Sequence, residues 1–258
     1  MTSVYGGSGD PARSIELLWG LREPPRRGPK PKLTVDGIAA AAIGIADAEG
    51  LAALSMRRVA AELGVTAMSL YSYVPGKAEL IDVMVDRVVG ENGVPDHEPG
   101  GWRSRLERVA RQAWDRYLRH PWLLQVATSR PVLGPNIIAR YDYELRAVAG
   151  IGLSNIEMDL VVSMIADYVH GAVRTAVELA QAEQQTGKTD IAWWEERAPL
   201  LAKVFDAERY PVAAEVGAAA GEEYQAAVDP ARSFEFGLAR LLDGVAVLVE
   251  RAARGETA

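Results

Sequence analysis

The chain has no cysteine and very few histidines, and these two shortages exclude several kinds of site. Without cysteine there is neither a disulfide framework nor a thiolate metal site. The three histidines, His97, His120 and His170, are scattered over 258 residues, and no two stand at the i, i+4 spacing of paired metal ligands. His120 precedes a proline at a predicted helix junction, and we interpret it as a structural cap. We therefore predict no metal and no cofactor.

Long apolar runs and a leader-like N-terminus are also lacking. No stretch approaches the roughly 18 apolar residues that a membrane-spanning helix needs. The first ten residues, MTSVYGGSGD, are polar and rich in glycine, unlike a signal peptide. We expect no membrane partner and a cytoplasmic location.

Strand-like alternation and catalytic motifs are absent as well. Aromatic residues make up 7% of the chain and hydrophobic residues 49%, with much alanine, which is typical of a globular all-α protein. A helical enzyme is the main rival hypothesis. The sequence offers it no nucleophile paired with a base, no phosphate-binding loop and no paired carboxylates in a motif, so we predict that the protein is not an enzyme.

Negative charge predominates, but it is unevenly distributed. The net charge is −7, while residues 1–90 carry equal numbers of basic and acidic side chains. Arg26 and Arg27 belong to a basic segment, residues 23–33, whose four prolines predict an extended backbone. This segment is either a solvated linker or an arm that lies along DNA phosphates or in the minor groove. We favour the arm, because it ends just before the motif described next.

The stretch from Ser55 to Lys77, SMRRVAAELGVTAMSLYSYVPGK, has the pattern of a helix-turn-helix. Ser55 can cap the first helix and Thr66 the second. Gly64 stands between them, where a left-handed backbone is least strained. Leu70 lies on the side of the second helix that faces the first helix. In such a motif the second helix enters the major groove of DNA.

Apolar residues recur at helical spacing through most of the remaining chain. Residues 90–101 interrupt this pattern with four glycines and two prolines, which predicts a linker. The predicted units are a flexible N-terminal extension with a basic arm (1–33), a helix-turn-helix DNA-binding domain (34–89) and a helical regulatory and dimerisation domain (101–254). Helices are predicted over residues 12–23, 34–48, 55–63, 66–73, 77–89, 102–119, 135–148, 154–185 and 189–204, with a short helix from 122, a weak one over 206–221 that Pro211 breaks, and a last one from 230.

Several motifs resemble the TetR family of bacterial transcriptional repressors. In the N-terminal part they are T-V-D-G-I-A-A-A-A at 34–42, A-D-A-E-G-L at 46–51, S-M-R-R-V-A-A-E-L-G-V at 55–65 and S-L-Y-S-Y-V-P-G-K-A-E-L at 69–80. Further motifs resemble the C-terminal domain of the tetracycline-repressor subgroup: H-P-W at 120–122, R-P-x-L-G-P at 130–135, A-G-I-G-L-S at 149–154, Y-V-H-G at 168–171 and F-E-F-G-L-A-R-L-L-D-G at 234–244. The resemblance implies a three-helix DNA-binding domain followed by a helical bundle for ligand binding and dimerisation.

The resemblance also implies a set of DNA contacts. It places residues 66–73 in the major groove of a double-stranded operator, with Tyr71 on a phosphate. Lys77 opens a helix, where an ammonium and free N–H groups would clamp another phosphate. Arg57 can reach a guanine, and Arg58 is a weaker candidate. The predicted DNA-binding residues are Arg57, Thr66, Ala67, Met68, Ser69, Tyr71, Ser72, Tyr73, Lys77, Arg26 and Arg27.

One such unit buries too little surface for strong specific binding, so a homodimer on a palindromic operator is expected. The broad apolar stripe of the last helix, together with the helix over 154–185, suits a four-helix bundle between two subunits. Part of this stripe must serve the core of the single chain. The predicted dimer-interface residues are Phe234, Leu238, Leu241, Leu242, Val245 and Leu248.

The C-terminal domain is expected to enclose an apolar pocket for an unknown small-molecule effector. The predicted lining residues are Trp114, Tyr117, Tyr141, Met164, Tyr168 and His170, each of which has core packing as its alternative. The mechanism implied is repression relieved by a population shift, with the helix over 77–89 as the lever. A regulator of the same fold without an effector, or an activator, is the alternative.

Overall fold

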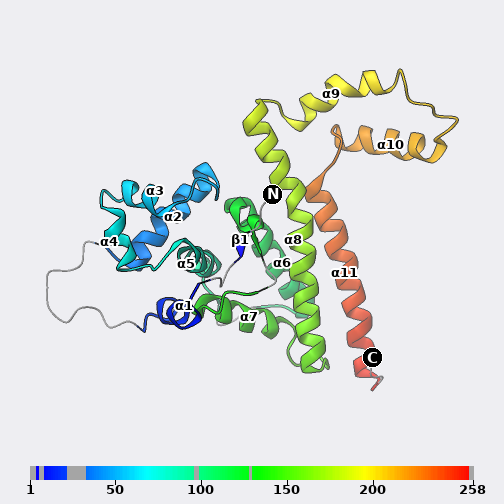
Figure 1. Ribbon diagram of the computed structural model, residues 1–258. Coiled ribbons are helices and arrows are strands. Elements are labelled where there is room, and N and C mark those ends of the chain that lie inside the picture. The colour runs from blue at the N-terminus through cyan, green and yellow to red at the C-terminus, as the bar shows by residue number, and fades with distance from the viewer. Residues whose placement is uncertain (1–3, 6–8, 22–32, 96–98, 128–129, 256–258) are drawn as a thin grey trace.

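The computed structural model describes residues 4–5, 9–21, 33–95, 99–127 and 130–255. Within these residues the secondary structure is helical except for one pair of two-residue strands (Figure 1). The predicted all-α fold class is therefore confirmed. The predicted arm residues Arg26 and Arg27 lie outside the described residues.

The strand pair joins the N-terminal extension to the middle of the chain. Strand β1 (Val4–Tyr5) runs parallel to β2 (Val126–Ala127), with Val4 opposite Val126. The expectation that the chain has no strands is wrong at this point. Two residues are too few to produce a recognisable period-2 alternation, so the sequence could not signal the pairing.

The N-terminal helices form around polar caps, and their apolar faces share one core. The hydroxyls of Thr34, Ser55 and Thr66 each accept a backbone N–H at the start of a helix, as the N-cap rule predicts. The helices are α1 (Pro11–Leu18), α2 (Val35–Glu49), α3 (Met56–Glu62), α4 (Ala67–Tyr71) and α5 (Lys77–Gly90). Their fully buried side chains include Ile38, Val59, Leu70, Leu80 and Met84.

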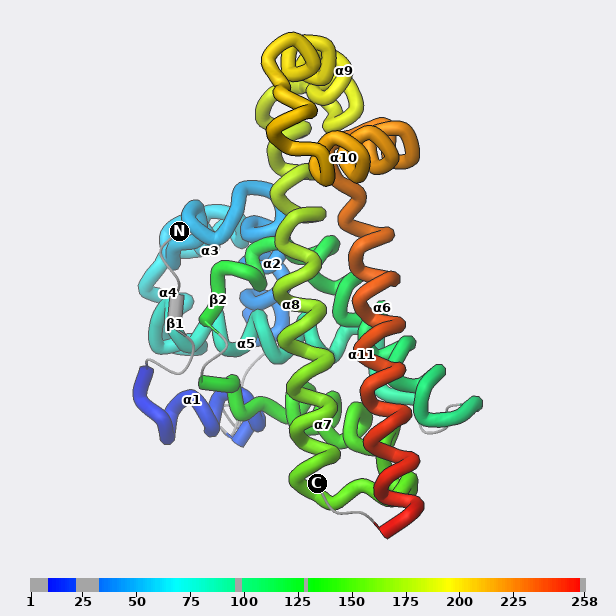
Figure 2. Tube along the Cα trace, turned by 90° about the vertical axis from the view of Figure 1, so that its right-hand side faces the viewer, coloured from blue at the N-terminus to red at the C-terminus, as the bar shows by residue number. Residues whose placement is uncertain are grey.

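The C-terminal helices form a second core around α8, which lies antiparallel and adjacent to α11 (Figures 1 and 2). The elements are α6 (Trp102–Arg119), the short 3-10 helix η1 (Pro121–Gln125), α7 (Pro135–Val148), α8 (Asn155–Thr186), α9 (Asp190–Leu201), α10 (Pro211–Tyr224) and α11 (Pro230–Ala253). Ser154 and Glu157 form the capping box that opens α8. The core includes Leu106, Ile165, Val169, Leu238 and Leu242.

Helix α8 is long and apolar enough to cross a membrane when judged by length and composition. The sequence pattern did not predict this, because polar residues interrupt the apolar ones along the helix. Its buried residues, such as Ile165 and Val169, instead pack against α6 and α11. This packing fits the central helix of a globular domain.

Helices α9 and α10 form an arm that projects beyond the ends of α8 and α11 (Figures 1 and 2). Neither helix has a buried residue. The prediction that Pro211 breaks a helix over 206–221 is wrong, because α10 begins at Pro211. Proline at the first helical position has no N–H to leave unsatisfied, so it starts a helix well.

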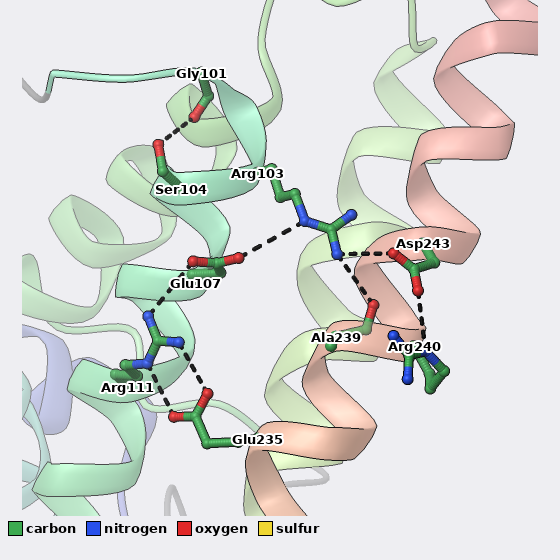
Figure 3. A network of polar contacts seen from close by, with 9 residues as sticks. All are labelled: Gly101, Arg103, Ser104, Glu107, Arg111, Glu235, Ala239, Arg240 and Asp243. Atoms are coloured by element: carbon green, nitrogen blue, oxygen red, sulfur yellow. Dashed lines mark hydrogen bonds and ion pairs between the residues drawn. The ribbon is translucent and has the colours of Figure 1, made fainter.

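Charged side chains connect α6 to α11 outside the apolar core (Figure 3). Arg111 donates two hydrogen bonds to the carboxylate of Glu235, at 2.9 and 3.0 Å. Nearer the start of α6, Arg103 donates to Asp243 at 2.8 Å and to the carbonyl of Ala239 at 3.3 Å. Hydrogen bonding to Arg111 lowers the pKa of Glu235, which fixes the sign of its effect on stability.

We predict that Glu235→Gln destabilises the protein at pH 7 by less than about 1 kcal/mol, because the ion pair is half-exposed. A lowered folded-state pKa stabilises the fold above the ordinary glutamate pKa of about 4.3 and ceases to do so as the pH falls through the lowered value. The difference from the wild type in urea unfolding should therefore be smaller at pH 3 than at pH 7. Glu250→Gln, an exposed substitution on the same helix, is the control. An equal loss at both pH values would contradict the prediction.

Candidate nucleic-acid interface and ligand cavity

The turn between α3 and α4 has the geometry of a helix-turn-helix. Gly64 has a φ of +65°, a left-handed backbone that favours glycine. The N–H of Val65 donates to the carbonyl of Ala60 at 3.0 Å and closes the turn. Leu70 is completely buried, which holds α4 against the other helices. The burial of Leu70 therefore determines which side of α4 faces outward.

The outward side of α4 exposes an apolar and an aromatic side chain. Met68 is 77% exposed and Tyr71 is 46% exposed. The hydroxyls of Thr66 and Ser69 bond each other at 2.9 Å, and Ser72 donates to the carbonyl of Ser69 at 2.7 Å. The hydroxyl groups thus stabilise α4 internally, and Met68 and Tyr71 reach furthest from it.

The other predicted contacts differ in how available they are. Ala67 and Tyr73 pack partly against the N-terminal core. Arg57 is exposed and has no hydrogen bond or ion pair within the described residues. Lys77 is the first residue of α5, whose N-cap residue Gly76 makes no side-chain cap and whose first turn also holds the buried acid Glu79.

Arg58 has a structural role instead. Its guanidinium pairs with Glu49 at the end of α2 at 2.7 Å and with Glu62 of α3 at 2.8 Å. Hydrogen bonds to these two carboxylates raise the pKa of Arg58. Arg58 therefore fixes the angle between α2 and α3, and Arg57 is the arginine left for a ligand.

The helix-turn-helix is attached to the C-terminal helices by buried polar contacts. His120 is buried and bonds Asp47 of α2 at 2.8 Å through Nδ1 and Glu91, which follows α5, at 3.0 Å through Nε2. Trp122 donates its indole N–H to the same oxygen of Asp47 at 2.8 Å. His120 thus does more than cap a helix junction, because it connects three elements.

A second attachment runs from α5 to α7. Asp86 is buried, and its carboxylate accepts the backbone N–H groups of Asn136 and Ile137, both at 3.0 Å. It also accepts the side-chain amide of Asn136 at 2.8 Å. An acidic side chain of α5 therefore caps the positive N-terminus of α7.

An apolar cavity of about 200 Å³ lies beside this attachment, between α5, α6, η1 and α7. Its polar side chains are Arg116, Tyr117 and Arg130. Its apolar walls are Val85, Val89, Leu123, Val126, Ala127, Pro131, Val132 and Ile137. A larger hollow of about 430 Å³ between α2 and α8 is lined largely by polar residues, among them Gln181, Gln184 and Gln185.

Of the six predicted pocket residues, only Tyr117 lines this apolar cavity. Burial raises the pKa of its phenol, and His170 lies beside it, with Nδ1 3.2 Å from the Tyr117 hydroxyl. Trp114 stacks on Phe234, with ring centroids 4.4 Å apart, and Tyr168 donates to the carbonyl of Phe234 at 2.8 Å. Both belong to the C-terminal core.

Two other predicted pocket residues lie at the surface. The Tyr141 hydroxyl donates to Asp159 at 2.6 Å, and Met164 lines a hollow between α8 and α11. The predicted pocket lining stays a prediction apart from Tyr117, because aromatic residues at helical spacing mark buried faces but do not distinguish a packed core from a cavity wall. Arg116 was missed because nothing in its spacing separates it from the exposed arginines of α6.

The predicted dimer-interface residues also divide into two groups. Phe234, Leu238, Leu242 and Val245 are buried in the core of the single chain, and of these four Val245 also lines the hollow between α8 and α11. Leu241 and Leu248 are only partly buried. They line the hollow between α8 and α11 together with Leu160 and Met164.

Helix α4 is held in place by the N-terminal core, and an apolar cavity lies beside α5. Together these features are typical of helix-turn-helix DNA-binding regulators with a separate C-terminal domain. Residues 33–84 match bacterial regulatory proteins of the tetR family, and residues 94–249 match the tetracyclin repressor-like C-terminal domain. The chain belongs to the TetR family of transcriptional regulators.

Relatives along the whole chain agree with this assignment. The HTH-type transcriptional repressor DrrR1 of Streptomyces coeruleorubidus is 48% identical over 98% of this chain and 91% of its own length. The structure of apo ActR from Streptomyces coelicolor is 29% identical with a TM-score of 0.67, covering 88% of this chain and all of ActR. ActR in complex with actinorhodin is 30% identical with a TM-score of 0.68, covering 82% and 94% of the two chains.

Proposed function

We propose that this regulator is a cytoplasmic homodimeric repressor that binds a palindromic operator through α4 and is released from it by a small molecule. The observation that carries the proposal is the outward side of α4, where Met68 and Tyr71 stand exposed beside the uncapped α5 N-terminus at Lys77. The name of DrrR1 as a repressor and the complex of ActR with actinorhodin support it. The relatives are regulators, and we propose no catalytic activity.

The proposed DNA contacts follow from side-chain chemistry. Met68 and Ala67 offer apolar contact to thymine methyl groups, and Arg57 offers a bidentate donor for guanine. Tyr71 and Lys77 are placed to bind phosphates, which fix the register of the helix on the duplex. Because Tyr71 is the one long hydrogen-bonding side chain of α4 and is assigned to a phosphate, Arg57, the basic arm and DNA shape carry a large part of the specificity.

The proposed dimer forms through the exposed side of α8 and α11. Leu160, Met164, Leu241 and Leu248 surround a hollow of about 390 Å³ on this side. Apolar side chains that gather on a surface mark an interaction site, and a two-fold axis would bring the same patch of a second chain against it. Two recognition helices would then face successive turns of the operator.

The proposed release passes through α5. Val85 and Val89 of α5 line the apolar cavity, and Lys77 stands at the other end of the same helix. A ligand that binds better to a conformation with displaced recognition helices lowers operator affinity. The cavity volume of about 200 Å³ is below the roughly 300–1,000 Å³ of pockets for drug-sized ligands, so the ligand must widen it.

The small cavity also favours a second candidate function, a regulator of the same fold that needs no effector, whether repressor or activator. Addition of actinorhodin, the ligand named for ActR, to the operator complex distinguishes the two candidates. Release of DNA supports the proposed repressor. No release by actinorhodin or by a panel of apolar acids and neutral aromatics favours the second candidate.

Replacing Lys77 or Tyr71 by alanine should weaken binding to an operator in the upstream region of the gene by about tenfold or more, because each variant gives up a phosphate contact in both half-sites. The plot of the logarithm of affinity against the logarithm of salt should become shallower by about one for every phosphate that Lys77 no longer neutralises. Fluorescence anisotropy with labelled operator measures both. Lys203→Ala, which removes an exposed lysine just after α9, is the matched control. Unchanged affinity in both variants would refute the proposed interface.

Leu241→Glu together with Met164→Glu should convert the dimer to a monomer at micromolar concentration, because four carboxylates would meet across the two-fold axis. The measurement is sedimentation velocity. Leu21→Glu, which adds a charge at an exposed leucine of the N-terminal extension, should leave the dimer intact. A wild-type protein that sediments as a monomer would be evidence against the proposed assembly.

A further inference from the structure

Arg116 is a half-buried cation without a partner. It lies near the end of α6 and lines the apolar cavity. Within the described residues its guanidinium has no hydrogen bond and no ion pair. Burial lowers the pKa of Arg116, because the charged form loses its hydration. A half-buried arginine without a protein partner at the wall of an apolar cavity has N–H donors free for a ligand.

The neighbouring charges do not neutralise Arg116. Glu144 is the nearby acid, but it accepts a hydrogen bond from Arg140 at 2.7 Å. Arg140 also donates to Gln112 at 2.6 Å, so it belongs to a satisfied buried group. Arg119 pairs with Glu91 at 3.4 Å. Both Arg140 and Arg119 repel Arg116, which leaves one surplus positive charge at the cavity wall.

Among the described residues that line it, the rest of the cavity is apolar apart from the Tyr117 hydroxyl and the exposed Arg130. We infer that the cavity takes a ligand with an apolar skeleton and one acidic oxygen, a carboxylate or an ionised phenol or enol, which pairs with Arg116. This inference rests on the proposed function as a ligand-released regulator and names the chemical class of the effector. Arginine suits this role, because it keeps its charge when buried and presents several donors to one oxygen acid.

Two fluorescent probes of similar shape test this inference without DNA. One is 1-anilinonaphthalene-8-sulfonate, which is an anion, and the other is N-phenyl-1-naphthylamine, which is neutral. Arg116→Gln should weaken binding of the anion about tenfold or more, because a hydrogen-bonded charge pair is removed, and leave binding of the neutral probe within about twofold. Arg116→Lys should retain most of the preference for the anion. Arg146→Gln, on the exposed surface of α7, is the control.

Equal weakening of both probes, or of neither, would overturn the inference. The melting temperature of the unliganded protein gives a second readout that a structural role would change. Arg116→Gln should leave it unchanged or raise it, because a buried charge without a partner is removed. A fall of the melting temperature would assign Arg116 to the fold. Since neither measurement uses operator DNA, failure here leaves the proposed DNA binding untouched, and failure of operator binding leaves the charge preference intact.

An independent observation concerns the N-terminal extension, which lies outside both matched family regions. Its strand β1 pairs with Val126 and Ala127, two residues of the cavity wall. The indole of Trp19 donates to the carbonyl of Leu133 at 2.9 Å, next to the wall residue Val132. The extension therefore holds the wall segment between η1 and α7 at two separate points.

The same extension is also fixed to α5. Helix α1 packs against α5, and Leu17 is buried in the N-terminal core. Gly9 lies so close to Glu79 in the first turn of α5 that a Cβ atom there would stand 2.0 Å from the carboxylate oxygen. One short stretch of chain thus contacts both the lever helix and the opposite wall of the cavity.

We propose that β1, α1 and Trp19 form a strap that keeps the cavity walls together, so that ligand entry requires the strap to give way. This proposal also depends on the proposed ligand-released function. A strap of this kind stabilises the arrangement in which the wall segment is held to α5.

Hydrogen exchange measured by mass spectrometry on the unliganded full chain tests the strap. In Trp19→Phe the hydrogen bond to Leu133 is removed, and the peptide that contains residues 126–137 should exchange about fivefold faster. A protein without residues 1–21 should exchange faster still. Trp193→Phe, the same substitution on the α9 arm, is the matched control. Wild-type exchange rates in both strap variants would overturn the proposal, and Trp19→Phe alone decides if the truncated chain does not fold.

Discussion

The buried contact between His120 and Asp47 joins the two halves of this protein, and the position of the recognition helix depends on it. Both ring nitrogens of His120 lie within hydrogen-bond distance of carboxylate oxygens, one on Asp47 and one on Glu91. Trp122 binds the same Asp47 oxygen and inserts its ring into the core of the N-terminal helices. The interface between the two halves therefore has an apolar centre and a polar edge whose groups are hydrogen-bonded, as a rigid interface between domains requires.

Helix α5 connects this interface to the apolar cavity and to the helix-turn-helix. Lys77 stands at its first residue, Val85 and Val89 face the apolar cavity, Asp86 caps α7, and Glu91 follows its last turn. The cavity wall and Lys77, the proposed phosphate contact, therefore lie on one helix. In the proposed release, a change in spacing at Val85 would move Lys77 and α4, because a helix transmits displacement along its axis with little bending.

Local rules predicted the parts of this molecule that depend on neighbours in sequence. Short-range chemistry predicts the helix caps at Thr34, Ser55 and Thr66 and the turn at Gly64. It predicts the all-α fold class as well. The ligand cavity and the strap depend on contacts between residues far apart in sequence, such as Trp19 and Leu133, which no periodicity records. The apolar stripe of α11 shows the same limit. Its pattern marks Leu238 and Leu241 alike, although Leu238 is buried in the chain and Leu241 is not.

The arm formed by α9 and α10 has a consequence for the order in which the protein loses its structure. Neither α9 nor α10 has a buried side chain, so the arm gains almost nothing from tertiary burial. Isolated helices of 12 or 14 residues are marginal in water. In a single chain the arm is therefore a separate cooperative unit with its own low free energy of opening, while the α6, α8 and α11 bundle stays intact. Fraying or cleavage of α9 and α10 would therefore expose no side chain of either helix that is buried in the folded chain.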